Sequence, residues 1–115
     1  MSAPLFVPWD IVKVPFPFTE GIGDKRRPAL IVSAKSLARE HKLYWLLMIT
    51  SVMKPAWAGD VALRDFEDAG LPVASIIRTA KITTLQEDRI LGRIGRLPTT
   101  ESRLVIAALG KWFES

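Results

Sequence analysis

The sequence predicts a mainly β fold with some α-helix: a small, strongly bent antiparallel sheet that forms a barrel or half-barrel, with short connecting helices and a C-terminal helix. Three observations lead to this fold class. Several short apolar segments follow one another, separated by turn-forming residues. Only the last segment shows a clear helical period. Finally, 115 residues suffice for one hydrophobic core and not for two, so we expect a single domain over residues 1–115.

Residues 10–18 predict the first strand, because apolar residues alternate along them. Those on one face are Val12, Val14, Phe16 and Phe18. Pro15 and Pro17 lack a backbone N–H and lie on the same edge of the strand, so pairing must stop there and the strand must leave the sheet. Residues 19–27 follow as a polar, basic hairpin loop, rich in glycine and charged groups.

Two nearly continuous apolar segments predict buried strands at residues 28–33 and 43–49. The connection between them, residues 34–42, contains helix formers and mixed charges and predicts a short helix. Because this connection is short, the two strands should be antiparallel neighbours. Further strands are expected at residues 60–63, 73–77, 81–85 and 89–97, with a kink at residues 78–80.

The C-terminal segment predicts the clearest helix. Pro98 precedes it, Thr99 is the expected N-cap, and Glu101 lies in the first turn, where a negative charge is favourable. One apolar stripe contains Val105, Ala108, Leu109 and Trp112, and it is widened by Leu104, Ile106 and Phe113. We interpret the additional width as a second contact surface, such as a dimer interface. The alternative is a helix that is fully embedded in its own domain.

The charge balance indicates a polyanionic partner. The net charge is +4 and the isoelectric point is about 9.8, so nucleic acid is the default partner. The chain has no cysteine, which excludes disulfides and thiol chemistry and is compatible with the cytoplasm. Neither a signal peptide nor a membrane-spanning segment is expected. No His, Asp or Glu cluster has metal-ligand spacing, so we expect neither a metal nor a cofactor.

The register of the two buried strands brings two polar residues together. If Val32 lies opposite Trp45, then Arg27 lies opposite Thr50 at one end of the sheet. Such a pair suits a phosphate, because the guanidinium can donate hydrogen bonds to two oxygens and the hydroxyl can donate to a third or position the attacking group. The alternative is that Arg27 is a solvated strand-edge charge and Thr50 an ordinary strand terminator.

Several short motifs occur in a defined order along the chain. They are DIVKVPFPFT at residues 10–19, KRRPALIVS at 25–33, MITS at 48–51, and AGLP at 69–72 followed by SIIR at 75–78. Their order and spacing resemble the motif series of the MazF/PemK toxins of type II toxin-antitoxin systems. The resemblance extends over residues 9–113.

This resemblance implies an SH3-like barrel, a homodimer and a metal-independent endoribonuclease. Single-stranded RNA would be cleaved at a short sequence by attack of the neighbouring 2′-hydroxyl, giving a 2′,3′-cyclic phosphate and a 5′-hydroxyl. By motif position, Arg27 and Thr50 carry over as the catalytic pair. Arg78 matches a basic position that faces the substrate, where it would bind phosphate or stabilise the transition state. The alternative is that Arg78 is a surface arginine at a strand end.

The expected substrate contacts are hydroxyl, basic and aromatic side chains: Thr19, Lys25, Arg26, Ser51 and Trp57. Trp57 is the tryptophan that we expect to contact the substrate or an antitoxin, whereas Trp45 and Trp112 fit core or interface positions better. The single histidine, His41, is expected at the surface, at the end of the strand pair opposite the catalytic residues. The resemblance further implies a cognate antitoxin, whose acidic, hydrophobic tail would lie across the basic groove.

The general base is not identified by the family pattern. Many PemK-like members have an acidic residue two positions after the arginine that matches Arg78, whereas this chain has Ala80 there. Arg27 is a poor base because a guanidinium stays protonated. Glu20 and Asp24, in the hairpin loop, are the carboxylates nearest in sequence and are the candidate bases. Reduced or lost nuclease activity is therefore an alternative.

Two other functions fit the same fold. A non-catalytic inhibitor, like the CcdB poisons of gyrase, would act by binding a protein. A plain RNA-binding SH3-like module would also fit the charge and the fold. The Arg-Pro step at residues 27–28 together with Thr50 favours the nuclease, and a plain binding module would give Thr50 no task.

Overall fold

The computed structural model describes residues 3–15 and 26–114, which form a mainly β fold with two α-helices. Along the chain the elements are β1 Asp10–Pro15, β2 Arg26–Ile31, α1 Lys35–His41, β3 Leu43–Ser51, β4 Asp60–Leu63, β5 Ser75–Gln86, the 3₁₀ helix η1 Glu87–Arg89, β6 Gly92–Arg96 and α2 Thr99–Gly110. The predicted short helix, the two buried strands, the strand at residues 60–63 and the C-terminal helix are confirmed. The expected continuation of the first strand through residues 16–18 and the hairpin loop at residues 19–25 lie outside the described residues.

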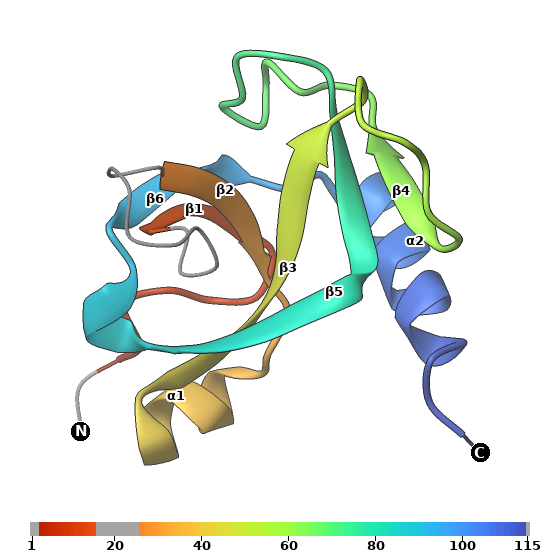
Figure 1. Cartoon of the computed structure of the whole chain (residues 1–115). Helices are drawn as coiled ribbons and strands as arrows, with labels where there is room; N and C mark the ends of the chain where they lie inside the picture. Colours follow the sequence, from red (N-terminus) through yellow and green to blue (C-terminus); the bar gives the residue numbers. More distant parts are fainter. Residues whose placement is uncertain (1–2, 16–25, 115) are drawn as a thin grey trace.

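The described strands form one antiparallel sheet in the order β4-β5-β3-β2-β1-β6. In Figure 1 the first half of β5 runs beside β4, and its second half turns toward η1 and β6. α2 packs against β4 and β5, whereas α1 lies at the end where β3 begins. The strongly bent antiparallel sheet with peripheral helices is therefore confirmed.

β5 is one strand of twelve residues, so the prediction of two separate strands is wrong. The predicted kink is nevertheless present as a shift in the pairing with β3: Leu47 pairs with Ile82, but Met48 pairs with Arg78. Residues 79–81 are therefore extra residues in β5. An irregularity of this kind bends a strand without ending it, because the backbone stays extended on both sides.

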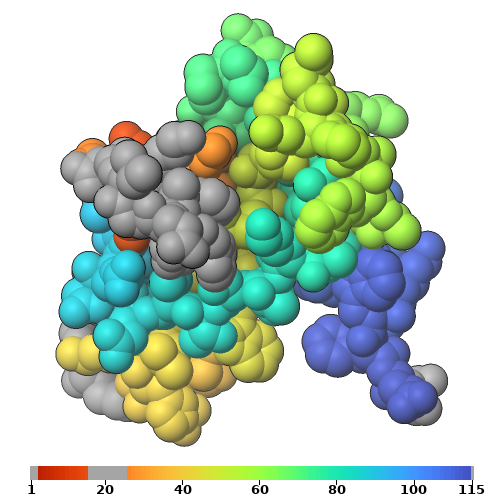
Figure 2. Space-filling model, in the orientation of Figure 1, coloured from red at the N-terminus to blue at the C-terminus, as the bar shows by residue number. Residues whose placement is uncertain are grey.

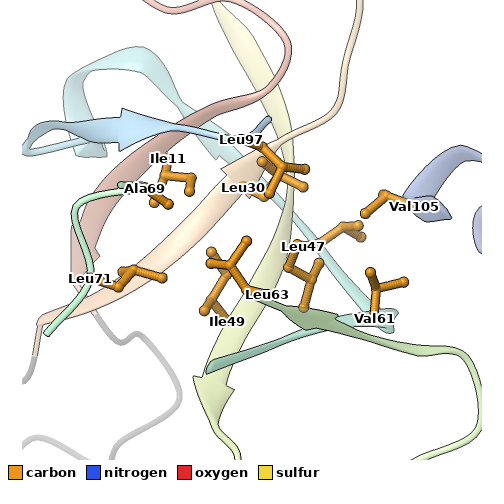
Figure 3. Packing of buried hydrophobic residues seen from close by; sticks show 11 residues of the cluster. Ile11, Leu30, Leu47, Ile49, Val61, Leu63, Ala69, Leu71, Leu97 and Val105 are labelled. Carbon is orange, nitrogen blue, oxygen red and sulfur yellow. The ribbon is translucent and has the colours of Figure 1, made fainter. Parts of the chain in front are cut away.

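Apolar side chains are buried on both faces of the sheet, because successive residues of a strand point to opposite faces. One cluster includes Ile11, Leu30, Leu47, Val61 and Val105, and Figure 3 shows Val105 of α2 pointing toward the side chains of the sheet. The other cluster includes Val12, Val14, Ala29, Ile31, Tyr44, Leu46 and Met48. Val12 and Val14 thus share a face, as predicted. Because β2 and β3 are buried on both faces, the ends of these strands are firmly held positions for functional side chains.

The start of α2 differs from the prediction by one residue. Thr99 is the first helical residue, and Pro98 occupies the cap position with an extended backbone and no side-chain cap. The fixed φ of proline favours this geometry immediately before a helix. Val105 is buried, whereas Leu104, Ile106 and Phe113 are exposed. In the single chain, the helix is therefore embedded on one side only. Among the described residues, no helix has the length and apolar character needed to span a membrane.

Candidate functional site

The pairing of β2 with β3 has the predicted register. Leu30 pairs with Leu47, and the N–H of Val32 donates to the carbonyl of Trp45 at 3.0 Å. Continued to the other end of the two strands, this register places Arg27 beside Thr50. Arg27 and Thr50 also line one pocket, which confirms that the two predicted catalytic residues lie close together.

This pocket is small and basic, with a volume of about 240 Å³. Its lining side chains are Arg27, Met48, Ile49, Thr50, Lys54, Arg78 and Lys81. Four of these carry a positive charge, and none of the described lining residues is acidic. Arg78, the third predicted catalytic residue, therefore belongs to the same pocket. Lys54 and Lys81 are additional cations that the sequence analysis did not single out, because nothing in their local sequence marks them.

Arg78 is buried, so the alternative interpretation of a surface arginine is wrong. Its Nη2 donates to Oδ2 of Asp60 at 3.0 Å and to the carbonyl of Pro55 at 2.7 Å, and its Nε donates to Oδ1 of Asp60 at 3.2 Å. Its Cζ lies 4.3 Å from the ring centroid of Trp57. Of the guanidinium nitrogens, Nη1 is the one without a bond to a described residue. The Arg78 side chain is thus held in one orientation at the edge of the pocket.

Asp60 is the buried partner of Arg78, which the sequence pattern did not indicate. It opens β4 and pairs with Arg78 across the strands, and its side chain is only 9% exposed. Two positions after Arg78, where many PemK-like members have an acidic residue, this chain has Ala80, which is exposed. The carboxylate beside Arg78 comes from the neighbouring strand instead. Asp60 does not line the basic pocket, so it binds the Arg78 guanidinium from outside the pocket.

Comparison with protein families matches residues 8–113 to the PemK-like, MazF-like toxin of type II toxin-antitoxin systems. The chain belongs to this family. The structures of other members agree with the fold. MazF from Deinococcus radiodurans has a TM-score of 0.73 and 21% sequence identity, over 97% of each chain. A mycobacterial endoribonuclease in complex with its cognate antitoxin has a TM-score of 0.73 and 19% identity, over 92% of each chain. The Mycobacterium tuberculosis toxin MazF-mt6 has a TM-score of 0.72 and 20% identity, over 89% of this chain and 93% of that chain. Comparison with curated protein sequences found no match.

Other candidate residues of this PemK/MazF-like toxin lie at varied distances from the pocket. Trp57 contacts Arg78 and is 46% exposed. Ser51 ends β3, and its Oγ accepts a hydrogen bond from the N–H of Met53 at 3.1 Å, so it shapes the following turn. Arg26 is exposed at the start of β2. Thr19, Glu20, Asp24 and Lys25 lie outside the described residues.

His41, Trp45 and Trp112 lie away from the basic pocket. His41 ends α1 and is exposed beside the start of β3, whereas Thr50 lies near the end of that strand. Trp45 and Trp112 are about half exposed and line a second, largely apolar groove of about 590 Å³. Trp45 is therefore a surface residue and not part of the core. Figure 2 shows a hollow between the C-terminal part of the chain, in blue, and the neighbouring surface of the molecule.

Trp112, in the segment that follows α2, is hydrogen-bonded to Thr79, next to the residues of the pocket. The indole N–H of Trp112 donates to Oγ1 of Thr79 at 3.0 Å, and this hydroxyl donates to the carbonyl of Gly59 at 2.7 Å. Thr79 and Gly59 directly adjoin Arg78 and Asp60 in sequence. No group of three or more His, Cys, Asp or Glu side chains in the described part of the chain is placed to hold a metal ion.

Proposed function

We propose that this chain is a sequence-specific, metal-independent endoribonuclease that cleaves single-stranded RNA. The observation that carries the proposal is the gathering of Arg27, Thr50 and Arg78 around one small basic pocket. A pocket of this size suits a phosphate group, and its positive charges suit the phosphorane-like transition state of RNA cleavage. Substrate contacts outside the pocket are assigned to Thr19, Lys25, Arg26, Ser51 and Trp57.

In the proposed reaction, the 2′-oxygen attacks the adjacent phosphorus while its proton passes to a base. The bond from phosphorus to the 5′-oxygen breaks, and this oxygen takes up a proton. The products are a 2′,3′-cyclic phosphate and a 5′-hydroxyl. Arg27 donates to two non-bridging oxygens, Thr50 donates to a third oxygen or orients the attacking hydroxyl, and Nη1 of Arg78 adds a further donor. Lys54 and Lys81 supply the remaining positive charge. This set of cations provides the charge stabilisation for which other nucleases use a metal.

The base is proposed to come from the hairpin loop, as Glu20 or Asp24. None of the described lining residues is a carboxylate or a histidine, and Asp60 already accepts hydrogen bonds from Arg78. This lack favours a second candidate function, an RNA-binding module that retains RNA without cleaving it. The two functions are separated by the state of the RNA after binding.

The test is incubation of the purified protein with a long single-stranded RNA in EDTA. Cleavage that leaves 5′-hydroxyl ends supports the proposal. Arg27→Ala should lower the rate by about 10²–10³, the usual loss on removal of one preorganised donor. Arg27→Lys should restore little, because an ammonium lacks the planar fork. Arg39→Ala, which removes an exposed arginine on α1, is the matched control and should cleave normally.

Other outcomes would lead to the alternative functions. Intact RNA that is retained on a filter would indicate the binding module with reduced or lost activity. Intact and unbound RNA together with inhibited gyrase would indicate a CcdB-like inhibitor. Cleavage that requires a divalent cation would refute the metal-independent chemistry.

We further propose that the protein is a cytoplasmic homodimer and that an antitoxin with an acidic tail neutralises it. The exposed apolar residues of α2 supply a surface for a second copy, and the positive charge around the pocket suits an acidic peptide. Light scattering should give twice the chain mass of 12.8 kDa. A monomer at micromolar concentration would contradict the proposal.

A further inference from the structure

Trp57 forms an aromatic surface beside the basic pocket. Its ring centroid lies 4.3 Å from the Cζ of Arg78, so the guanidinium covers one face of the indole. The residue is nevertheless 46% exposed. Since one face is covered, the opposite face is the part of the ring that a partner can reach. An indole held in this way keeps one flat stacking surface.

The loop that carries this indole is held by hydrogen bonds on both sides. The N–H of Trp57 donates to Oδ2 of Asp60 at 2.8 Å, and its carbonyl accepts from the N–H of Asp60 at 3.2 Å. Nη2 of Arg78 donates to the carbonyl of Pro55 at 2.7 Å. The ring is therefore positioned before a ligand arrives, which reduces the entropy that binding must cost.

The adjacent pocket determines which kind of ligand fits. Its volume of about 240 Å³ lies below the roughly 300–1,000 Å³ of pockets that enclose drug-sized ligands, so it suits a phosphate group better than a whole nucleotide. Arg78 borders both this pocket and the indole, and Lys54 lines the pocket three residues before Trp57. A ligand whose anionic group occupies the pocket would thus place its next flat group near the indole. Single-stranded nucleic acid alternates such groups along its length.

We propose that Trp57, backed by the guanidinium of Arg78, stacks on one unpaired base next to the phosphate in the pocket. The inference rests on the proposed function for its substrate, RNA, and concerns binding rather than cleavage. Because every base has a π-face, the contact adds affinity with little sequence preference. A base inside a duplex is covered by its neighbours, so the contact also favours single strands over duplexes.

The test measures binding of a fluorescent 2′-O-methyl oligonucleotide of mixed sequence, which lacks the attacking hydroxyl and cannot be cleaved by the proposed route. Trp57→Leu should weaken binding about 10-fold or more, as expected for loss of one base stack. Trp57→Phe, which keeps an aromatic face, should recover a large part of the affinity. Trp45→Leu is the matched control, because Trp45 is 45% exposed but lies in the apolar groove, and it should bind like the wild type.

A spectroscopic measurement reports stacking independently of affinity. Saturating oligonucleotide should quench part of the tryptophan fluorescence in the wild type and in Trp45→Phe, and this part should be absent in Trp57→Phe. Equal quenching in all three proteins would overturn the proposal. So would normal oligonucleotide binding by Trp57→Leu. If that variant instead loses affinity only for an acidic, hydrophobic peptide, the indole is a protein contact and the proposal is wrong.

Two comparisons distinguish failure of the stacking proposal from a folding defect of the variant and from failure of the nuclease proposal. Trp57→Leu should weaken binding of a single strand more than binding of a duplex of the same length; an equal loss for both would refute stacking. If wild-type protein binds the oligonucleotide with the predicted dependence on Trp57 but leaves unmodified RNA intact, the nuclease proposal fails and the stacking proposal stands. If Trp57→Leu cleaves subsaturating RNA as fast as the wild type, the nuclease proposal stands and the stacking proposal fails.

Discussion

Removal of the Asp60 carboxylate should destabilise the fold strongly, because it would leave the charge of Arg78 buried without a counterion. The two side chains are each 9% exposed and share two hydrogen bonds, at 3.0 and 3.2 Å. Asp60 also accepts the N–H of Trp57 at 2.8 Å, so Asp60→Ala removes three hydrogen bonds. Breaking a buried pair by deleting one partner typically costs about 3–5 kcal/mol. Since the free energy of unfolding of a small domain is about 5–15 kcal/mol, this loss would be a large fraction of its stability.

The assay is urea unfolding followed by circular dichroism at pH 7. The free energy of unfolding of Asp60→Ala should fall by about 3–5 kcal/mol relative to the wild type. Asp68→Ala, which removes an exposed carboxylate from the turn after β4, is the control and should change it by less than about 0.5 kcal/mol. In the double variant Asp60→Leu with Arg78→Met, much of the stability should return, because no buried charge remains.

A loss below about 1 kcal/mol in Asp60→Ala would refute this reasoning, since such values are typical of exposed ion pairs. The double variant gives a second criterion. If it is as unstable as the sum of its two single variants, Asp60 and Arg78 are energetically independent and the described pair does not hold the loop at residues 55–60.

Three further predictions follow from single residues. Gly59 has a φ of 87°, and an added Cβ would lie 2.6 Å from the ring carbon Cζ2 of Trp112. Gly59→Ala should therefore lower the urea midpoint by the equivalent of about 1–2 kcal/mol. Gly110→Ala is the control and should not lower it, because nothing lies within 4 Å of a Cβ added there. Burial, aided by the hydrogen bond to Glu87, raises the pKa of Tyr44 to about 12. The folded state thus holds the phenolic proton at a pH where the unfolded chain loses it, so the free energy of unfolding should fall between about pH 10 and 12, and a fall of equal slope in Tyr44→Phe would contradict this. Lys54→Ala should weaken oligonucleotide binding and reduce the slope of log affinity against log salt by about 0.7, the value for one phosphate contact on a single strand; an unchanged slope would place Lys54 outside the phosphate contacts.

The pairing of Arg27 with Thr50 could be predicted because it depends on local pattern alone. Both flank continuous apolar strands, and the connection between these strands is short enough to leave one antiparallel arrangement. Once one pair of residues is aligned, the register fixes every other pair along the strands. The predicted alignment of Val32 with Trp45 has the same register as the observed pairs.

Asp60 could not be found in this way, because its partner Arg78 lies eighteen residues further along the chain. The connection between β4 and β5 is too long to fix their register as a tight turn would. Sequence pattern predicted both β4 and the segment around Arg78, but not that these strands pair. Sequence pattern also left open whether Trp45 takes a core or an interface position, and its exposure excludes the core position. Apolar composition marks the strand as buried, but an exposed position within it is recognised only when the neighbouring groove is known.

The extra residues in β5 determine which side chains the strand presents on each face. Arg78 is paired with Met48, and Leu85 is paired with Tyr44, so all four residues face the same side of the sheet. Arg78 and Leu85 are nevertheless an odd number of positions apart, which in a regular strand would place them on opposite sides. The three residues 79–81 therefore act as a change of phase in the alternation of side chains. With strict alternation along β5, either the arginine would point away from the pocket or the leucine would point out of the core. The irregularity thus allows one continuous strand to place a pocket residue, Arg78, and a core residue, Leu85, on the same face.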